Sequence, residues 1–195
     1  MSFVPRGHPQ QVSHDPGYEA LPGFDQVANA YDIDDRETVP EDFAVFDRRF
    51  EFSIDAAASD HNHKCERYFT AEDDGLRQPW EGERVWCNPP FSNIEPWVRK
   101  AWAEVAADVI VMLLPANRCE QPWWQSLVEP YRDGGGRLTT EFLPGRMRFM
   151  APGDGRVRPK SGPPFGCVLL IWADPATRPT WRGEAGYITG YGDAS

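Results

Sequence analysis

The sequence lacks the features that mark membrane, disulfide-rich and metal-binding proteins. No apolar run reaches the roughly 18 residues needed for a membrane helix, and residues 1–10 contain no apolar signal core, so we expect a cytoplasmic protein that does not enter a membrane. The four cysteines form no Cys-x-x-Cys pair, which argues against a disulfide framework or a zinc ribbon. Asp60, His61, His63 and Cys65 are the nearest approach to a metal cluster. Because no second cluster completes a tetrahedral set, we expect a polar loop there and no metal.

Positive charge is also scarce, which is unusual for a protein that contacts phosphate groups. The net charge is −10, and only three of the 20 basic residues are lysines, a balance that resembles halophilic proteins, although a GC-rich genome also favours arginine. The acidic excess lies in residues 1–60, which contain four arginines and thirteen acidic residues. Residues 144–160 contain five basic residues and one acidic residue. We expect the basic residues to contact a nucleic-acid backbone: Arg146, Arg148, Arg156, Arg158 and Lys160. The alternative is a loop whose charges keep an acidic protein soluble.

Hydrophobic periodicity predicts an α/β domain that follows a loosely ordered acidic arm. Residues 1–38 are rich in proline, glycine and aspartate and show no sustained period, whereas residues 39–195 are expected to form one monomeric domain. The predicted order is a short helix from Glu41, a strand over 50–54 ending at Asp55, an apolar run over 84–87, a helix over 94–107, a strand over 109–114, a helix over 121–128, and strands over 138–142, 146–150 and 167–172. This order predicts a mostly parallel sheet with antiparallel strands added late.

The tetrapeptide Asn88-Pro89-Pro90-Phe91 follows the apolar run over 84–87 and carries the clearest chemistry. In open α/β sheets, ligands bind beyond the carboxyl ends of the strands. The Asn88 side-chain oxygen and the Pro89 carbonyl can accept hydrogen bonds from a conjugated amine and make its nitrogen more nucleophilic. The prolines fix φ and hold these oxygens in place, and Phe91 would stack on a base drawn out of its helix. The alternative is a rigid turn between a strand and a helix.

Several segments, in the same order, resemble the phage-type DNA N-6-adenine methyltransferase (Dam) family. The resemblance covers roughly residues 39–172 and is carried by the stretches 52–59, 68–70, 73–76, 79–80, 85–92, 114–116, 123–124, 145–149 and 164–167. It implies a Rossmann-like methyltransferase fold, S-adenosylmethionine as methyl donor, and the N6 amine of adenine in double-stranded DNA as target, reached by base flipping. For a virus-encoded enzyme, the location would be the host cytoplasm.

The resemblance also implies cofactor-binding residues. Asp55 and Ala56, at the end of the first strand, would contact the methionine part of the cofactor, and Asp73 or Asp74 would border its adenosine or the target base. Asp55 could instead cap a helix, and the two later aspartates could form a solvated turn. The sequence departs from expectation in having no Phe-x-Gly-x-Gly loop and in placing Val39-Pro40 where a Thr-Pro pair is expected.

Other functions remain open on the sequence. Asn-Pro-Pro-aromatic loops also methylate glutamine side chains in proteins and amines in RNA. The N4 amine of cytosine is likewise a poor nucleophile because its lone pair is conjugated with the ring, although a Ser or Thr commonly replaces the Asn in enzymes that methylate it. An acidic α/β module that binds a partner without catalysis is a further alternative, kept open by the missing glycine loop. Binding of S-adenosylmethionine in calorimetry separates the enzymes from the module.

Overall fold

The computed structural model describes Asp34 and residues 37–147, 149–150 and 165–179. Most of the predicted arm, and four members of the predicted basic cluster, lie outside the described residues: Arg148, Arg156, Arg158 and Lys160. No helix within the described ranges is both long and apolar enough to cross a membrane.

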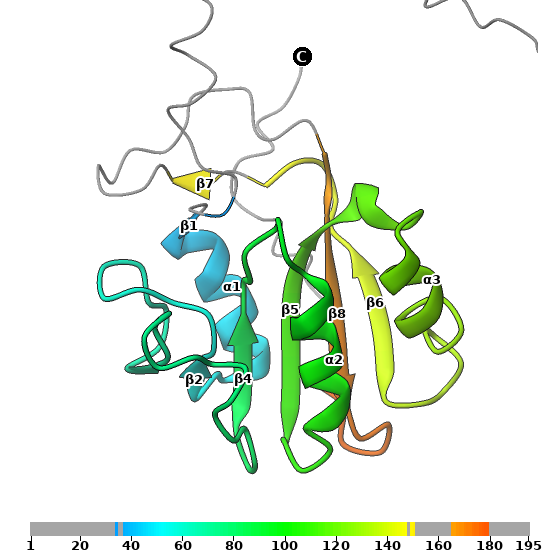
Figure 1. The fold of residues 1–195 in the computed structure, drawn as a ribbon, viewed down its shortest axis with the longest axis horizontal. Coiled ribbons are helices and arrows are strands. Elements are labelled where there is room, and N and C mark those ends of the chain that lie inside the picture. The colour runs from blue at the N-terminus through cyan, green and yellow to red at the C-terminus, as the bar shows by residue number, and fades with distance from the viewer. Residues whose placement is uncertain (1–33, 35–36, 148, 151–164, 180–195) are drawn as a thin grey trace, which may run out of the picture. The chain divides into compact units, whose positions relative to one another are not determined.

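A six-stranded sheet forms the centre of the described chain, in the order β3-β2-β4-β5-β8-β6 (Figure 1). The strands are β2 (Ile54–Asp55), β3 (Arg67–Tyr68), β4 (Arg84–Cys87), β5 (Val109–Pro115), β6 (Leu138–Phe142) and β8 (Cys167–Ala173). The first four run parallel, whereas β8 is antiparallel to both β5 and β6. The prediction of a mostly parallel sheet with a late reversal is therefore confirmed.

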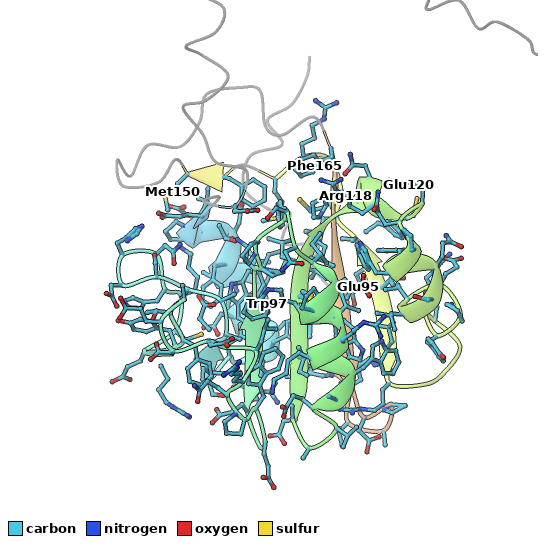
Figure 2. The ribbon with its side chains drawn as sticks, in the orientation of Figure 1. Glu95, Trp97, Arg118, Glu120, Met150 and Phe165 are labelled. Carbon is cyan, nitrogen blue, oxygen red and sulfur yellow. The ribbon has the colours of Figure 1, made fainter. Side chains whose placement is uncertain are left out.

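Strand β5 is buried on both faces because its apolar run leaves no polar side for solvent. Ile110, Met112 and Leu114 pack in one core cluster with residues of helices α2 (Glu95–Ala103) and α3 (Pro122–Leu127). Their neighbours along the strand pack in a second cluster with helix α1 (Pro40–Phe50). Helices thus cover both faces of the sheet, and the parallel strands end together at one edge, where Arg118 and Phe165 also lie (Figure 2).

Four predicted elements have other boundaries in the structure. The strand expected over 50–54 is only Ile54–Asp55, because Phe50 belongs to the apolar face of α1 and Glu51 ends that helix with φ 49°. The helix expected over 94–107 stops at Ala103, and α3 is one residue shorter at each end than predicted. Of the described residues in the strand expected over 146–150, Phe149 and Met150 form β7 (Phe149–Met150), whereas Arg146 and Met147 belong to no strand.

Strand β7 pairs with a strand that the sequence did not predict. Its antiparallel partner is β1 (Glu37–Thr38), and the two form a separate two-stranded sheet. Glu37 and Thr38 are buried, although the sequence assigned them to the loosely ordered arm. Ordered structure in the described chain therefore begins before residue 39.

Candidate functional site

A pocket of about 370 Å³ lies at the carboxyl ends of β2 and β4. The chain passes from β2 to the edge strand β3 and returns to place β4 on the other side of β2, so the two strand ends meet at a topological switch point. Asp55 is in register with Trp86, two residues before Asn88. The volume falls within the roughly 300–1,000 Å³ typical of small-molecule sites.

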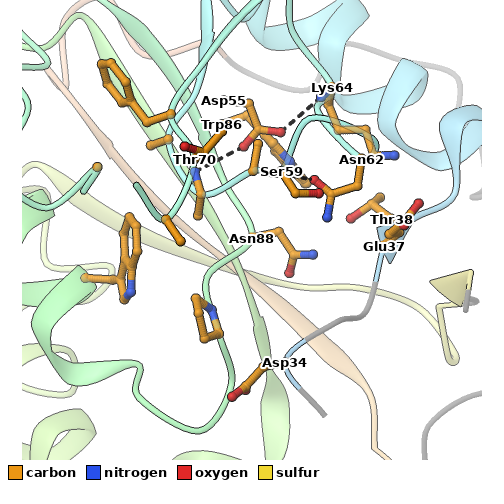
Figure 3. A pocket seen from close by; sticks show the side chains of 18 of the residues that line it. Asp34, Glu37, Thr38, Asp55, Ser59, Asn62, Lys64, Thr70, Trp86 and Asn88 are labelled. Carbon is orange, nitrogen blue, oxygen red and sulfur yellow. Dashed lines mark hydrogen bonds between the residues drawn. The ribbon is translucent and has the colours of Figure 1, made fainter. Parts of the chain in front are cut away.

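Asp55 is the buried acid of this pocket. Its side chain accepts hydrogen bonds from the backbone N–H groups of Ala57 (3.3 Å) and Lys64 (3.0 Å), which fix its orientation (Figure 3). Burial raises the pKa of Asp55 to about 6, against the opposing effect of these two hydrogen bonds. Burial makes the ionised carboxyl less stable than in water, so a cationic group of a ligand in the pocket would stabilise it.

Lys64 is the only lysine or arginine among the described residues that line the pocket. Burial lowers the pKa of its amine, while the negative charges of Glu37 and Asp55 act in the opposite direction. Thr38 also lines the pocket, and its hydroxyl oxygen is buried with no hydrogen-bond partner among the described residues. Neither residue could be predicted from the sequence as part of a site, because a single lysine or threonine carries no motif.

Gly75 packs directly against the backbone at the end of β2. A Cβ atom built on Gly75 would lie 2.2 Å from the carbonyl oxygen of Ala56, far inside van der Waals contact. The Trp80 indole donates a 3.2 Å hydrogen bond to the Gly75 carbonyl and fixes this turn against the end of β2. Trp97 borders Gly75 and gives the pocket an aromatic wall.

The structure separates the two adjacent aspartates. The Asp73 carboxylate accepts 2.8 Å hydrogen bonds from the backbone N–H and the hydroxyl of Thr70, which lower its pKa, and the side chain is exposed. Asp74 has φ 53°, lies 3.1 Å from the Arg77 guanidinium, and lines the pocket. Asp73 therefore closes a local turn, and Asp74 is the member of the pair that a ligand can reach.

The tetrapeptide spans two environments. Asn88 and Pro90 line the pocket, and Figure 3 shows the Asn88 side chain between Asp55 and Asp34. Pro89 is buried. Phe91 is 4% exposed and does not line the pocket: its ring packs edge-on against two others, Phe149 and Phe165, at centroid distances of 6.3 and 6.2 Å.

Asp34 ties the chain before β1 to the residue that follows the tetrapeptide. Its carboxylate accepts hydrogen bonds from the backbone N–H (2.8 Å) and the hydroxyl (2.5 Å) of Ser92. Asp34 also lines the pocket. The pairing joins residues 58 positions apart, which sequence periodicity cannot reveal.

The remaining sequence predictions lie outside this pocket or outside the described chain. Arg146, the one described member of the basic cluster, is exposed in the loop before β7. In the predicted polar loop, His63 stacks on Tyr68 at 4.2 Å, and its Nδ1 lies 2.9 Å from the Cys65 carbonyl oxygen. Among the described residues, no group of three potential ligands is placed to hold a metal ion.

Comparison with known proteins gives one family and two similar phage proteins. The sequence profile of the family described as DNA N-6-adenine-methyltransferase (Dam) matches residues 29–182. A DNA N-6-adenine-methyltransferase of Escherichia phage T1 is 36% identical over 83 residues, 41% of this chain and 35% of the relative. Another, of Haemophilus phage HP1, is 37% identical over 65 residues, 32% of this chain and 38% of the relative. The matched segments thus span little more than a third of each relative.

Proposed function

Since the chain belongs to the DNA N-6-adenine-methyltransferase family, we propose that it transfers a methyl group from S-adenosylmethionine to the N6 amine of adenine in DNA. One observation carries the proposal: Asp55 and Asn88 extend from neighbouring parallel strands into the same pocket. Asp55, which would bind the methyl donor, and Asn88, which would bind the target amine, therefore line the same pocket. The sheet order and the helices on both faces support a Rossmann-like methyltransferase fold.

The charges of the pocket fit the methionine end of the cofactor. That end carries a sulfonium, an ammonium group and a carboxylate. Asp55 would hold the ammonium group, and Lys64 would bind the carboxylate together with the Thr38 hydroxyl, whose oxygen is buried without a partner among the described residues. Trp97 offers a surface for the adenine ring, and Asp74 is placed to accept a hydrogen bond from a ribose hydroxyl.

The chain's own residues would activate the target amine and hold it in line with the donor. When bound, S-adenosylmethionine supplies an electrophilic methyl group. The Asn88 side-chain oxygen and the Pro89 carbonyl accept the two N6 hydrogens, which draws the nitrogen lone pair out of conjugation with the ring. Pro89 and Pro90 restrict the loop, so little conformational freedom is lost when the amine binds.

Phe91 supports the loop from the core side in this structure. Its edge-on contacts with Phe149 and Phe165 fix the end of the tetrapeptide against the second core cluster. Stacking on a flipped adenine would require the ring to leave these contacts and enter the pocket. We propose that this movement accompanies base flipping.

The proposed activity is tested by methylating DNA with the full chain and S-adenosylmethionine that carries an isotopic label in the methyl group. We expect N6-methyldeoxyadenosine after digestion to nucleosides and mass spectrometry. Parallel reactions contain RNA or a mixture of proteins with accessible glutamines. Label in N4-methyldeoxycytidine, in RNA or in glutamine, or no label in any substrate, would contradict adenine methylation.

The affinity for S-adenosylmethionine is expected to fall as the pH is lowered through about 6, the pKa of Asp55. Below that pH the carboxyl is neutral and no longer attracts the ammonium group, which stays charged because its own pKa is near 8. Calorimetry between about pH 7 and 5 should show a loss approaching tenfold per pH unit at the acid end. Asp55→Asn should bind weakly at every pH. A variant that keeps the wild-type pH dependence would show that another group titrates.

Lys64→Met is expected to weaken the binding of S-adenosylmethionine roughly tenfold, because a charge-assisted hydrogen bond to the carboxylate of the cofactor is lost. Decarboxylated S-adenosylmethionine provides the matched control, since it lacks the group that Lys64 would bind. Its dissociation constant, measured by calorimetry, should be the same for variant and wild type. Equal losses for both ligands would mean that Lys64 only shapes the pocket.

A further inference from the structure

A second, smaller hollow of about 200 Å³ begins where the cofactor pocket ends. The tetrapeptide divides the two spaces: Pro90 lines the cofactor pocket and Phe91 lines the hollow, and no residue lines both. The hollow, which we call the Arg118 groove, is lined by Phe91, residues 92–95, Arg118, Gln121 and Trp123. It therefore joins the catalytic loop to the 3-10 turn η1 (Ala116–Arg118) at the carboxyl end of β5.

Arg118 brings a positive charge to this groove, and within the described chain its nearest opposite charge is the exposed carboxylate of Glu120, whose pKa it helps to lower. Its Nε is shielded from solvent and has no hydrogen-bond partner among the described residues. A buried guanidinium N–H without an acceptor costs free energy, which an oxygen anion in the groove would recover. The planar fork of arginine suits phosphate oxygens better than any other cationic side chain.

The acidic residues that border the groove are held by donors of their own. The Glu95 carboxylate lies 2.7 Å from the Arg99 guanidinium, one helical turn along α2. Glu120 accepts a 2.9 Å hydrogen bond from the Gln121 amide, and the Asp34 carboxylate accepts hydrogen bonds from the backbone N–H and the hydroxyl of Ser92. Arg118 is the cationic side chain that lines the groove, and no described residue accepts a hydrogen bond from its Nε.

We propose that the Arg118 groove binds a backbone phosphate of DNA beside the target adenine. The inference rests on the proposed function. Phe91 is three positions after Asn88, a reach of at most about 11 Å, which is the scale of one nucleotide. A nucleotide whose N6 amine meets Asn88 can therefore place an adjoining phosphate at Arg118, where the contact positions the strand without reading its sequence.

The test compares Arg118→Gln with wild type in binding a mixed-sequence DNA duplex at several KCl concentrations. Loss of one phosphate contact should reduce the slope of log affinity against log salt by about 0.9. DNA should bind roughly tenfold more weakly in low salt, and Arg118→Lys should keep the slope because it keeps the charge. The dissociation constant for S-adenosylmethionine should not change, because Arg118 is outside the cofactor pocket.

Arg67→Gln is the matched control, since it removes the same charge from an exposed site. Its guanidinium pairs with Glu83, which comes just before β4. Arg67 therefore lies at the amino ends of the parallel strands, whereas the pocket and the groove lie at their carboxyl ends. A slope reduced equally by Arg67→Gln and Arg118→Gln would show only a general charge effect and overturn the proposal. An unchanged slope in Arg118→Gln would do the same while leaving adenine methylation intact. If Arg118→Gln lowers the slope as expected but wild type methylates no adenine, the proposed function fails and the phosphate site stands.

Discussion

Asn88→Ala is expected to reduce the rate of methyl transfer by about 100- to 1,000-fold, while the affinity for S-adenosylmethionine stays within about twofold of wild type. The estimate corresponds to about 2.7–4 kcal/mol of transition-state stabilisation, by analogy with the loss of one oxyanion-hole group. The Asn88 oxygen acts on the amine that receives the methyl group, and the proposed donor contacts come from other residues of the pocket. Single-turnover methylation of DNA and calorimetry with the cofactor measure the two quantities.

Asn88→Asp separates the loss of the acceptor from a general disturbance of the loop. Aspartate keeps an acceptor oxygen at the same position and replaces the amide NH2 with a second oxygen that shares a negative charge, so it should recover part of the activity that alanine loses. A rate above one tenth of wild type in Asn88→Ala would show that the amine is activated elsewhere. Equal inactivity of both variants, with cofactor binding intact, would point to a need for the amide nitrogen.

Gly75→Ala is expected to damage the fold and the cofactor pocket together. The added Cβ would lie 2.2 Å from the Ala56 carbonyl oxygen and 3.3 Å from its carbon, and both are backbone atoms that cannot rotate away. The end of β2 must therefore shift, next to the carboxyl group of Asp55. Overpacking of this kind lowers the free energy of unfolding by about 1–3 kcal/mol. The shift would also displace the Asp55 carboxyl from the ammonium group of S-adenosylmethionine, and losing this one charge-assisted contact should weaken cofactor binding roughly tenfold.

Gly134→Ala is the control for this variant. No atom lies within 4 Å of a Cβ built on Gly134, so the same methyl group is added in open space. Its free energy of unfolding in urea should stay within about 0.5 kcal/mol of wild type. Gly75→Ala with equal stability and equal cofactor affinity would mean that the turn can move aside without cost.

The sequence by itself determined the chemistry that is local along the chain. Asn88 to Phe91 are consecutive and follow a short apolar strand, so their place at a strand end could be predicted from hydrophobicity and turn residues. The six apolar residues before Pro115 predicted a strand buried on both faces, because such a run leaves no side for solvent. Asp55 was placed at its strand end for the same reason, although the strand proved shorter than expected.

Only the tertiary structure decided which side chains share the pocket with these residues. Lys64, Thr38 and Gly75 come from separate segments, and each is an ordinary residue until the strand order brings it beside Asp55. That Asp74 and not Asp73 lines the pocket also became visible only in the structure, where the Asp73 carboxylate is bonded to Thr70. Periodicity reports which face of an element is apolar, but a contact between distant segments depends on packing of the whole chain, which no local pattern encodes.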